Sequence, residues 1–242
     1  MKKSALIILD GTMKGAYTVG ILRVFYEKLG LNYFDSIYSF SVGIFEQAFF
    51  VANQPETMEN TWRNYVSGSK LINPFNVFRG KAILDLDYLT GLFQTEMSLL
   101  NIKQMLISPI NIYCFVTDHS TRLPVILNLK EGENIFDIMR ASCAVPLLYP
   151  PVKIGNKKYI DGVFACKKKI MMEIKRICDR FDEIIVISNS GSIRFLPTNP
   201  KIKLIRPSDM PLWHPLDTNR SRIIKTIEQG KMDALEFLQN QG

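Results

Sequence analysis

The sequence predicts an α/β fold: a three-layer αβα sandwich with a mostly parallel central sheet. Short apolar runs alternate with longer helical patterns, and runs such as "ALIILD" and "EIIVIS" are apolar at nearly every position, as in strands buried on both faces. A hydrophobic content of 47% in 242 residues allows a sizeable core. Because no linker, repeat or low-complexity tract divides the chain, we expect one domain over residues 1–242.

The N-terminal part predicts two strand–helix units in succession. They are a strand over 5–10, a helix over 15–30, a strand over 34–40 and a helix over 43–54. The first helix ends at Gly30 and carries few polar residues, so we expect it to pack deep in the fold. The second ends before Pro55, and only Glu46 and Gln47 are expected to face water.

The remaining elements continue the alternation. Strands are predicted over 110–118, 123–129, 152–155, 157–160, 183–188 and 202–207, and helices near 56–66, 86–95, 134–142, 168–179 and 217–240. The apolar stretch 89–106, "LTGLFQTEMSLLNIKQML", is compatible with a lipid-facing lid, but ordinary core helices are the favoured interpretation.

Charge and targeting signals indicate compartment and partners. The net charge of +7 suits an anionic partner, either nucleic acid or a lipid surface, although lysine clusters such as 167–169 are more often solvated faces. The N-terminal apolar run is shorter than the apolar region of a signal peptide, which predicts a cytoplasmic protein.

Cysteine and histidine usage argues against a metal site. The four cysteines, Cys114, Cys143, Cys166 and Cys178, show no C-x-x-C spacing, and the chain has only two histidines. We therefore expect buried free thiols, no metal and no cofactor.

The loop after the first strand, "DGTMKGAY" over 10–17, precedes a helix. Its backbone N–H groups could cradle a phosphate or a developing oxyanion. The glycines lack the G-x-G-x-x-G spacing of a dinucleotide site, and Lys14 is followed by Gly15 rather than by Ser or Thr as in a P-loop. Nucleotide binding is therefore disfavoured.

The second strand-to-helix turn reads "SFSVG", Ser39 to Gly43, which has the outline of a G-x-S-x-G nucleophile elbow with Ser39 in place of the first glycine. Small residues also occur at such corners for packing alone. One strand–helix unit separates Ser41 from the first loop, so both lie at one sheet edge. This placement brings backbone donors beside a nucleophile, as acyl transfer requires.

The base for such a serine is open at this point. His214 would follow Ser41 and Asp161 in the chain order of an α/β-hydrolase triad, although that fold builds several strands before its elbow. His119 ends a strand in a polar turn, where capping is the simpler role. Asp161 directly follows the strand "KKYI" and precedes Gly162, a pattern that also occurs in ordinary turns.

Together these pieces resemble the patatin-like phospholipase family over nearly the whole chain. The family pattern is G-G-G-x-[RK]-G, then G-x-S-x-G, then D-G-[GA]; this sequence has "DGTMKG", "SFSVG" and "DGV" in that order. The stretch 138–162 is similar to the family segment leading to its aspartate.

The resemblance implies lipid acyl-ester hydrolysis by a Ser/Asp dyad, without a histidine. Ser41 would be the nucleophile and Asp161 the general base, with an acyl-serine intermediate. Gly11, Thr12 and Met13 would form the oxyanion hole beside Lys14. Phospholipid or another acyl lipid is the implied substrate, with peripheral contact at an anionic membrane and no nucleic-acid partner.

The sequence departs from the family pattern in ways that favour a weakened enzyme or a lipid- or protein-binding domain as the alternative. Asp10 and Thr12 replace two glycines of the loop, and a β-branched residue enters positive φ only at a cost. Val163 replaces the second glycine of the aspartate turn, which we expect to weaken that turn. Lys167 and Lys169 stand where the family has Asn and Pro.

Overall fold

A computed structural model describes residues 2–9, 11–132 and 134–240 of the chain. Its central sheet has eight strands: β1 (Ser4–Leu9), β2 (Ser36–Phe40), β3 (Asn111–Asp118), β4 (Pro124–Asn128), β5 (Val152–Ile154), β6 (Lys157–Asp161), β7 (Glu183–Ser188) and β8 (Ile202–Ile205). The helices are α1 (Gly15–Lys28), α2 (Gly43–Val51), α3 (Pro55–Asn64), α4 (Leu86–Leu92), α5 (Ile102–Ile107), α6 (Ile135–Cys143), α7 (Lys167–Cys178) and α8 (Arg220–Gln239). The predicted α/β architecture is confirmed.

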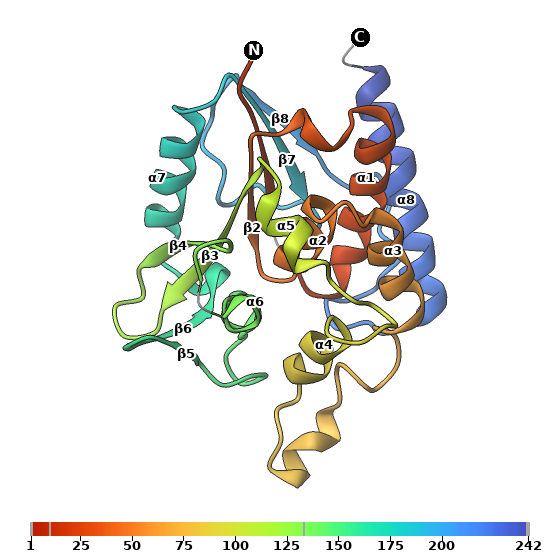
Figure 1. Cartoon of the computed structure of the whole chain (residues 1–242), viewed down its shortest axis with the longest axis vertical. Coiled ribbons are helices and arrows are strands. Elements are labelled where there is room, and N and C mark those ends of the chain that lie inside the picture. The colour runs from red at the N-terminus through yellow and green to blue at the C-terminus, as the bar shows by residue number, and fades with distance from the viewer. Residues whose placement is uncertain (1, 10, 133, 241–242) are drawn as a thin grey trace.

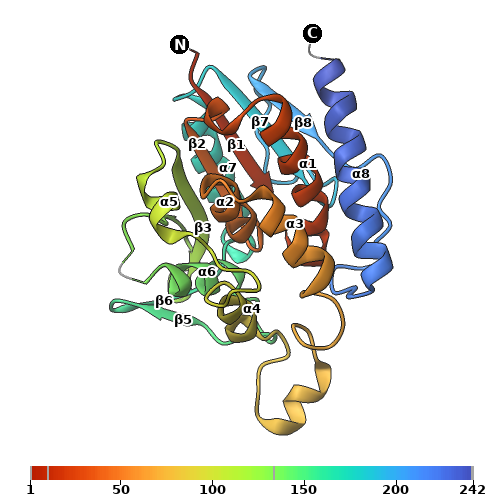
Figure 2. The same cartoon turned by 45° about the vertical axis from the view of Figure 1, so that its right-hand side comes forward.

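The sheet is mixed. Strands β3, β2, β1, β7 and β8 run parallel in that order, whereas β4 and β6 pair antiparallel with β3, and β5 pairs antiparallel with β6. Helices cover both faces: α1, α2 and α8 lie on one side and α7 on the other (Figures 1 and 2). The even-numbered side chains of β1, Leu6 and Ile8, pack into the first layer, and Ile7 packs under α7.

Helix α1 lies deep in the fold, as its composition predicts. Its contact with α8 depends on two glycines, because a Cβ at Gly20 would lie 2.0 Å from the carbonyl oxygen of Ile227, and one at Gly230 would lie 2.2 Å from that of Tyr17. The two backbones therefore touch directly, and this holds the N-terminal end of α1 in place behind the first loop.

Helix α2 corrects one expectation. Glu46 and Gln47 were expected to face water, but both are fully buried. The helix is enclosed on all sides, and the Gln47 side chain donates a hydrogen bond to the Tyr113 carbonyl at 3.0 Å. The polar pair therefore reflects interior roles, and not a solvent face.

The cysteines and the apolar stretch 89–106 largely match the expectations from the sequence. Cys114, Cys143 and Cys178 are buried free thiols, but Cys166 is exposed, since it precedes the first turn of α7 at the surface. The stretch 89–106 forms α4, α5 and their connection, with Leu89 and Leu92 among its core residues. No helix within the described ranges combines the length and apolarity needed to cross a bilayer.

Candidate active site

Ser41 sits in a sharp turn between β2 and α2. Its backbone is left-handed, with φ of 51°, which is uncommon for a residue other than glycine and marks local strain. The turn is tight because Gly43 packs on β1: a Cβ at position 43 would lie 2.8 Å from Cγ2 of Ile8. The Ser142 hydroxyl donates to the Ser41 carbonyl at 3.3 Å. These contacts give the turn the geometry of a nucleophile elbow.

Strand order brings Asp161 to this turn. On one edge of β3 lies β4; the opposite edge is shared end to end by β2, which pairs up to Phe115, and β6, which pairs from Val116 onward. Phe40 is the partner of Phe115, and Asp161 is the partner of Val116. Ser41 directly follows β2, and Asp161 is the last residue of β6. Because their strands end at consecutive positions along the same edge of β3, the two residues lie close together.

The Asp161 carboxyl group is buried and interacts with Ser41. Burial raises the pKa of Asp161 to about 6, against the lowering effects of a hydrogen bond from the Ser41 side chain and one from the Val163 N–H at 3.0 Å. A carboxylate with a pKa near neutrality is suited to act as a general base. Position 162 requires a glycine, because a Cβ there would lie 2.4 Å from the Phe115 carbonyl oxygen of β3.

The first loop lies directly against the serine. A Cβ at Gly11 would lie 2.5 Å from Cβ and 2.8 Å from Oγ of Ser41, so only glycine allows this approach. Thr12 has a left-handed backbone with φ of 63°, and its hydroxyl donates to the Gly11 carbonyl. Thus Thr12 does adopt the conformation that its β-branched side chain opposes.

The backbone donors of this loop are not equivalent. The Met13 N–H donates to the Pro215 carbonyl at 2.9 Å and is already occupied. Within the described residues, the N–H groups of Gly11 and Thr12 donate no backbone hydrogen bond beyond those inside regular helices and strands. Of the three residues predicted to form the oxyanion hole beside Lys14, Gly11 and Thr12 are therefore the ones whose N–H groups could stabilise an oxyanion.

A polar mouth opens beside the serine and the aspartate. Besides Ser41 and Asp161, it is lined by Lys14 from the first loop and by Arg194 from the β7–β8 connection. The Arg194 guanidinium lies 4.4 Å from the centre of the Phe195 ring, which orients it. Arg194 was missed by sequence reasoning, because no motif surrounds it and only the parallel pairing of β7 with β1 brings its loop to this edge.

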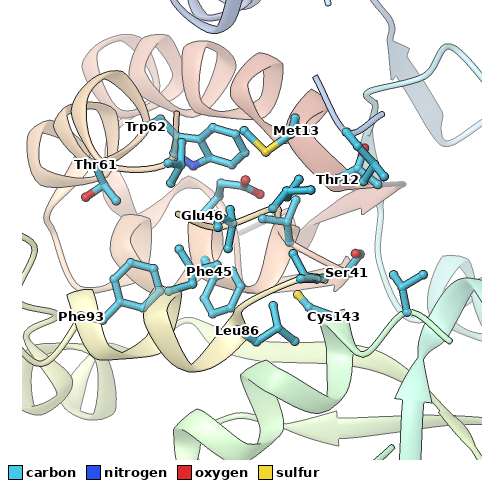
Figure 3. Close-up of a pocket in the computed structure, with 18 of the residues that line it drawn as sticks. Thr12, Met13, Ser41, Phe45, Glu46, Thr61, Trp62, Leu86, Phe93 and Cys143 are labelled. Atoms are coloured by element: carbon cyan, nitrogen blue, oxygen red, sulfur yellow. The ribbon is translucent and has the colours of Figure 1, made fainter. Parts of the chain in front are cut away.

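An apolar cavity extends inward from the other side of Ser41 (Figure 3). Thr12, Ser41 and Cys143 lie at one end, and Phe93 and Thr61 lie far from them. The lining is almost entirely apolar, with contributions from α2, α3, α4 and the segments around residues 71–72 and 145–148. Such a cavity suits a hydrocarbon chain.

Glu46 is the carboxylic acid in this lining. It is fully buried, and neither carboxyl oxygen has a hydrogen-bond partner within the described chain. Burial raises the pKa of the Glu46 carboxyl well above its usual range, because the charged form would lose its hydration there. An unsatisfied buried polar group costs about 1–3 kcal/mol, so its presence calls for an explanation.

The histidines lie elsewhere. His214 is exposed and its Nδ1 accepts from the Leu216 N–H at 3.2 Å, while His119 lines a different surface pocket beside Pro146. Neither residue lines the mouth or the cavity at Ser41. Within the described residues, no cluster of three or more metal-binding side chains occurs either.

The departures from the family pattern have different consequences. Asp10 lies outside the described residues. Ser39 is fully buried and its hydroxyl has no partner in the described part of the chain, so this replacement is destabilising. Val163 was expected to weaken its turn, but the turn forms with Val163 outside the left-handed region, and Lys167 and Lys169 are simply exposed on α7.

Comparison with known proteins gives a consistent family match. The sequence model of the patatin-like phospholipase family matches residues 11–166, which is more than half of the chain. The uncharacterized protein YjjU of Escherichia coli is 27% identical over 161 residues, covering 65% of this chain and 44% of YjjU. This chain therefore matches less than half the length of that relative.

Two solved structures are similar over 99% of this chain. VipD from Legionella pneumophila has a TM-score of 0.53 at 10% identity, with 67% of VipD covered, which supports the fold. ExoU of Pseudomonas aeruginosa, solved in a complex with SpcU, has a TM-score of 0.49 at 12% identity with 52% covered, too low to carry an argument.

Proposed function

Because the chain belongs to the patatin-like phospholipase family, we propose that it hydrolyses acyl-lipid esters, with Ser41 as nucleophile and Asp161 as general base. One observation carries the proposal: Ser41 lies where an apolar cavity meets a polar mouth that also contains Asp161. An ester with its acyl chain in the cavity and its headgroup in the mouth would present its carbonyl to Ser41. No other serine of the described site combines a strained turn with a neighbouring carboxylate.

The steps follow from the groups present. Asp161 takes the Ser41 proton as Oγ attacks the ester carbonyl, and the N–H groups of Gly11 and Thr12 stabilise the oxyanion. The proton then passes to the leaving alcohol, which leaves an acyl-serine. Asp161 next activates water, which releases the acid and regenerates the serine.

The mouth supports an anionic or zwitterionic headgroup. Lys14 and Arg194 both line it, and neither forms a salt bridge within the described residues. Two cations beside the reacting ester are suited to a phosphate, which arginine binds with two parallel hydrogen bonds. A phospholipid is accordingly the proposed substrate class.

Contact with a membrane is proposed through the projecting segment 73–82 (Figures 1 and 2). Its 3-10 helix, Pro74–Arg79, exposes 70% of Phe75 and 86% of Phe78, and the segment carries Arg79 and Lys81 but no acidic residue. Aromatic side chains flanked by cations favour an anionic interface. At the base of the segment, Ile72 and Leu84 pair with each other and also line the cavity, which links this surface to Ser41.

Hydrolysis is tested with purified protein on phospholipid vesicles and p-nitrophenyl acyl esters. The expected result is turnover that Ser41→Ala abolishes while the variant keeps the native circular-dichroism spectrum and melting temperature. Equal turnover by Ser41→Ala would refute the assignment.

Membrane contact is tested by sedimentation with vesicles of phosphatidylcholine, with and without phosphatidylglycerol, using the Ser41→Ala protein so that no lipid is consumed. The double variant Phe75→Ser, Phe78→Ser should bind at least about tenfold more weakly to the anionic vesicles. Met232→Ser, which removes an exposed apolar side chain on α8, is the control. Equal binding by the double variant and the control would exclude this surface.

A catalytically impaired domain that binds lipid or a protein is the second candidate. The observation in its favour is the strained Thr12 backbone together with the occupied Met13 N–H, which leaves few oxyanion donors. Vesicle binding without any turnover, by a protein whose Ser41 does not react with a fluorophosphonate, would select this candidate.

A further inference from the structure

The Glu46 side chain lines the cavity from helix α2. Helix α2 presents Val42, Phe45, Glu46 and Phe49 to the cavity, at the i, i+3, i+4, i+7 spacing of one helix face. The carboxyl lies against the start of α1, because a Cβ at Gly15 would be 2.4 Å from Oε1 of Glu46 and 2.9 Å from Cζ2 of Trp62. Figure 3 shows it among Trp62, Met13 and Phe45.

The surrounding protein does not explain this group. Both carboxyl oxygens are buried without partners, and no salt bridge to Glu46 exists within the described residues. Thr61, another polar side chain of the lining, is already engaged with the Thr57 carbonyl and with Ser98. A leucine at position 46 would fill the same space without the unsatisfied oxygens, so the acid is retained at a cost to stability.

We propose, on the premise of the hydrolase function above, that the cavity selects acyl chains carrying a hydroxyl group, which the Glu46 carboxylic acid binds. A neutral acid donates one hydrogen bond and accepts others, which matches a hydroxyl group. Burial without a charged partner favours the neutral acid over the carboxylate, and the apolar walls exclude water from competing.

The position of Glu46 sets where the hydroxyl should lie on the chain. Glu46 lies three residues beyond Gly43, the first residue of α2, a rise of about 4.5 Å along the helix axis, and Ser41 precedes the helix. The hydroxyl is therefore expected several carbons from the ester and not beside it. A chain without this group would leave the acid unpaired, and such sites discriminate strongly against the analogue lacking the hydroxyl.

The test compares p-nitrophenyl octanoate with its monohydroxy derivatives, the hydroxyl being moved carbon by carbon. For at least one mid-chain isomer, kcat/KM should exceed that of the plain ester by about tenfold or more. Glu46→Leu should abolish this preference, so that the kcat/KM of the hydroxy ester relative to that of the plain ester falls to about one. Phe49→Leu, which alters an apolar wall, should change the rate but keep the preference.

Glu46→Gln separates the proposal from its rival, a cationic ligand held by a carboxylate. The amide still hydrogen-bonds a hydroxyl, so most of the preference should remain. Preference for an amino-substituted chain over the hydroxy chain, lost in Glu46→Gln, would overturn the proposal.

Binding without catalysis keeps the test independent of hydrolysis. The chain has two tryptophans; Trp62 lines the cavity, and Trp213 is 80% exposed. In a Ser41→Ala, Trp213→Phe protein, Trp62 fluorescence reports binding of octanoic and hydroxyoctanoic acids. Tighter binding of a hydroxy acid, lost with Glu46→Leu, supports the site even if no ester is cleaved. Equal binding of all acids would refute the site, and turnover of plain esters would still support the hydrolase function.

Discussion

The two turns that meet at the site, at Ser41 and at Thr12, both hold a non-glycine residue in left-handed backbone, but they are supported differently. The serine turn is fixed at both ends by buried elements, with Gly43 against Ile8 and the Ser142 hydroxyl on the Ser41 carbonyl. The threonine turn is half-buried, and its long-range support is the hydrogen bond from Met13 to Pro215. Packing therefore enforces strain at the serine, whereas the loop at Thr12 has more freedom to relax.

This difference gives the two turns different places in the proposed reaction. At Ser41 the strained turn places the side chain in the mouth beside Asp161, as the proposed reaction requires. At Thr12 it positions an N–H group that a glycine would position at lower energy. We therefore expect the elbow to tolerate no change and the loop to be open to improvement.

The largest effect on kcat is expected from replacing Asp161, the carboxylate beside the Ser41 turn. Asp161→Asn removes the base and should lower kcat for ester hydrolysis by about 10²–10⁴-fold with little change in KM. His214→Ala, at the exposed histidine, should leave the rate unchanged. Steady-state kinetics on the two proteins decide between an aspartate and a histidine base, since the opposite pattern would remove Asp161 from the mechanism.

The second-largest effect on kcat is expected from disturbing the contact between Gly11 and Ser41. Gly11→Ala would put a Cβ 2.5 Å from that of Ser41, so one turn must move. Loss of an oxyanion donor typically lowers kcat by about 10²–10³-fold, and we expect an effect of this size. Gly91→Ala, where the added Cβ meets open space, is the matched control. An unaffected kcat in Gly11→Ala would separate the loop from catalysis.

The pH dependence should reflect Asp161. The base acts when ionised, and its pKa is about 6, so kcat/KM should rise through pH 6, flatten above it and be about tenfold lower one pH unit below the pKa. A profile that is flat from pH 5 to 8 would contradict this role, as would a rate that falls across that range.

The raised pKa of Asp161, which suits a general base, lowers the free energy of unfolding at neutral pH. Because the native pKa is raised from 3.8, the unfolded state loses its proton first, and the native state is destabilised as the pH rises from about 4 to about 6. The full effect at neutral pH is about 3 kcal/mol. Asp161→Asn should therefore unfold at a higher denaturant concentration at pH 7 than at pH 4, relative to the native protein; an equal difference at both pH values would count against the shift.

The smallest effect is expected from Thr12→Gly. Relief of the left-handed strain should stabilise the protein by about 1 kcal/mol and raise kcat a few-fold. Arg122→Gly relieves a comparable φ of 59° outside the site and should raise stability alone. If Thr12→Gly lowers kcat, the threonine side chain itself has a role and the interpretation of the loop is wrong.

Much of this arrangement could be predicted from the sequence, and the reasons for the remainder are physical. The alternation of buried strands and helices predicts the sheet, and three ordered motifs predict Ser41, Asp161 and the first loop as the site, which the structure brings together. Glu46 was misplaced because a polar residue on an apolar helix normally faces water. Arg194 and the Met13–Pro215 hydrogen bond depend on long-range contacts that no local pattern encodes.

Reaction of Ser41 with a fluorophosphonate, located by mass spectrometry, tests the central claim most directly. The native protein and His214→Ala should be labelled at Ser41 at equal rates, and Asp161→Asn at least about tenfold more slowly. Labelling that is absent, that falls on another residue, or that proceeds equally fast in Asp161→Asn would contradict the pairing of this serine with this aspartate.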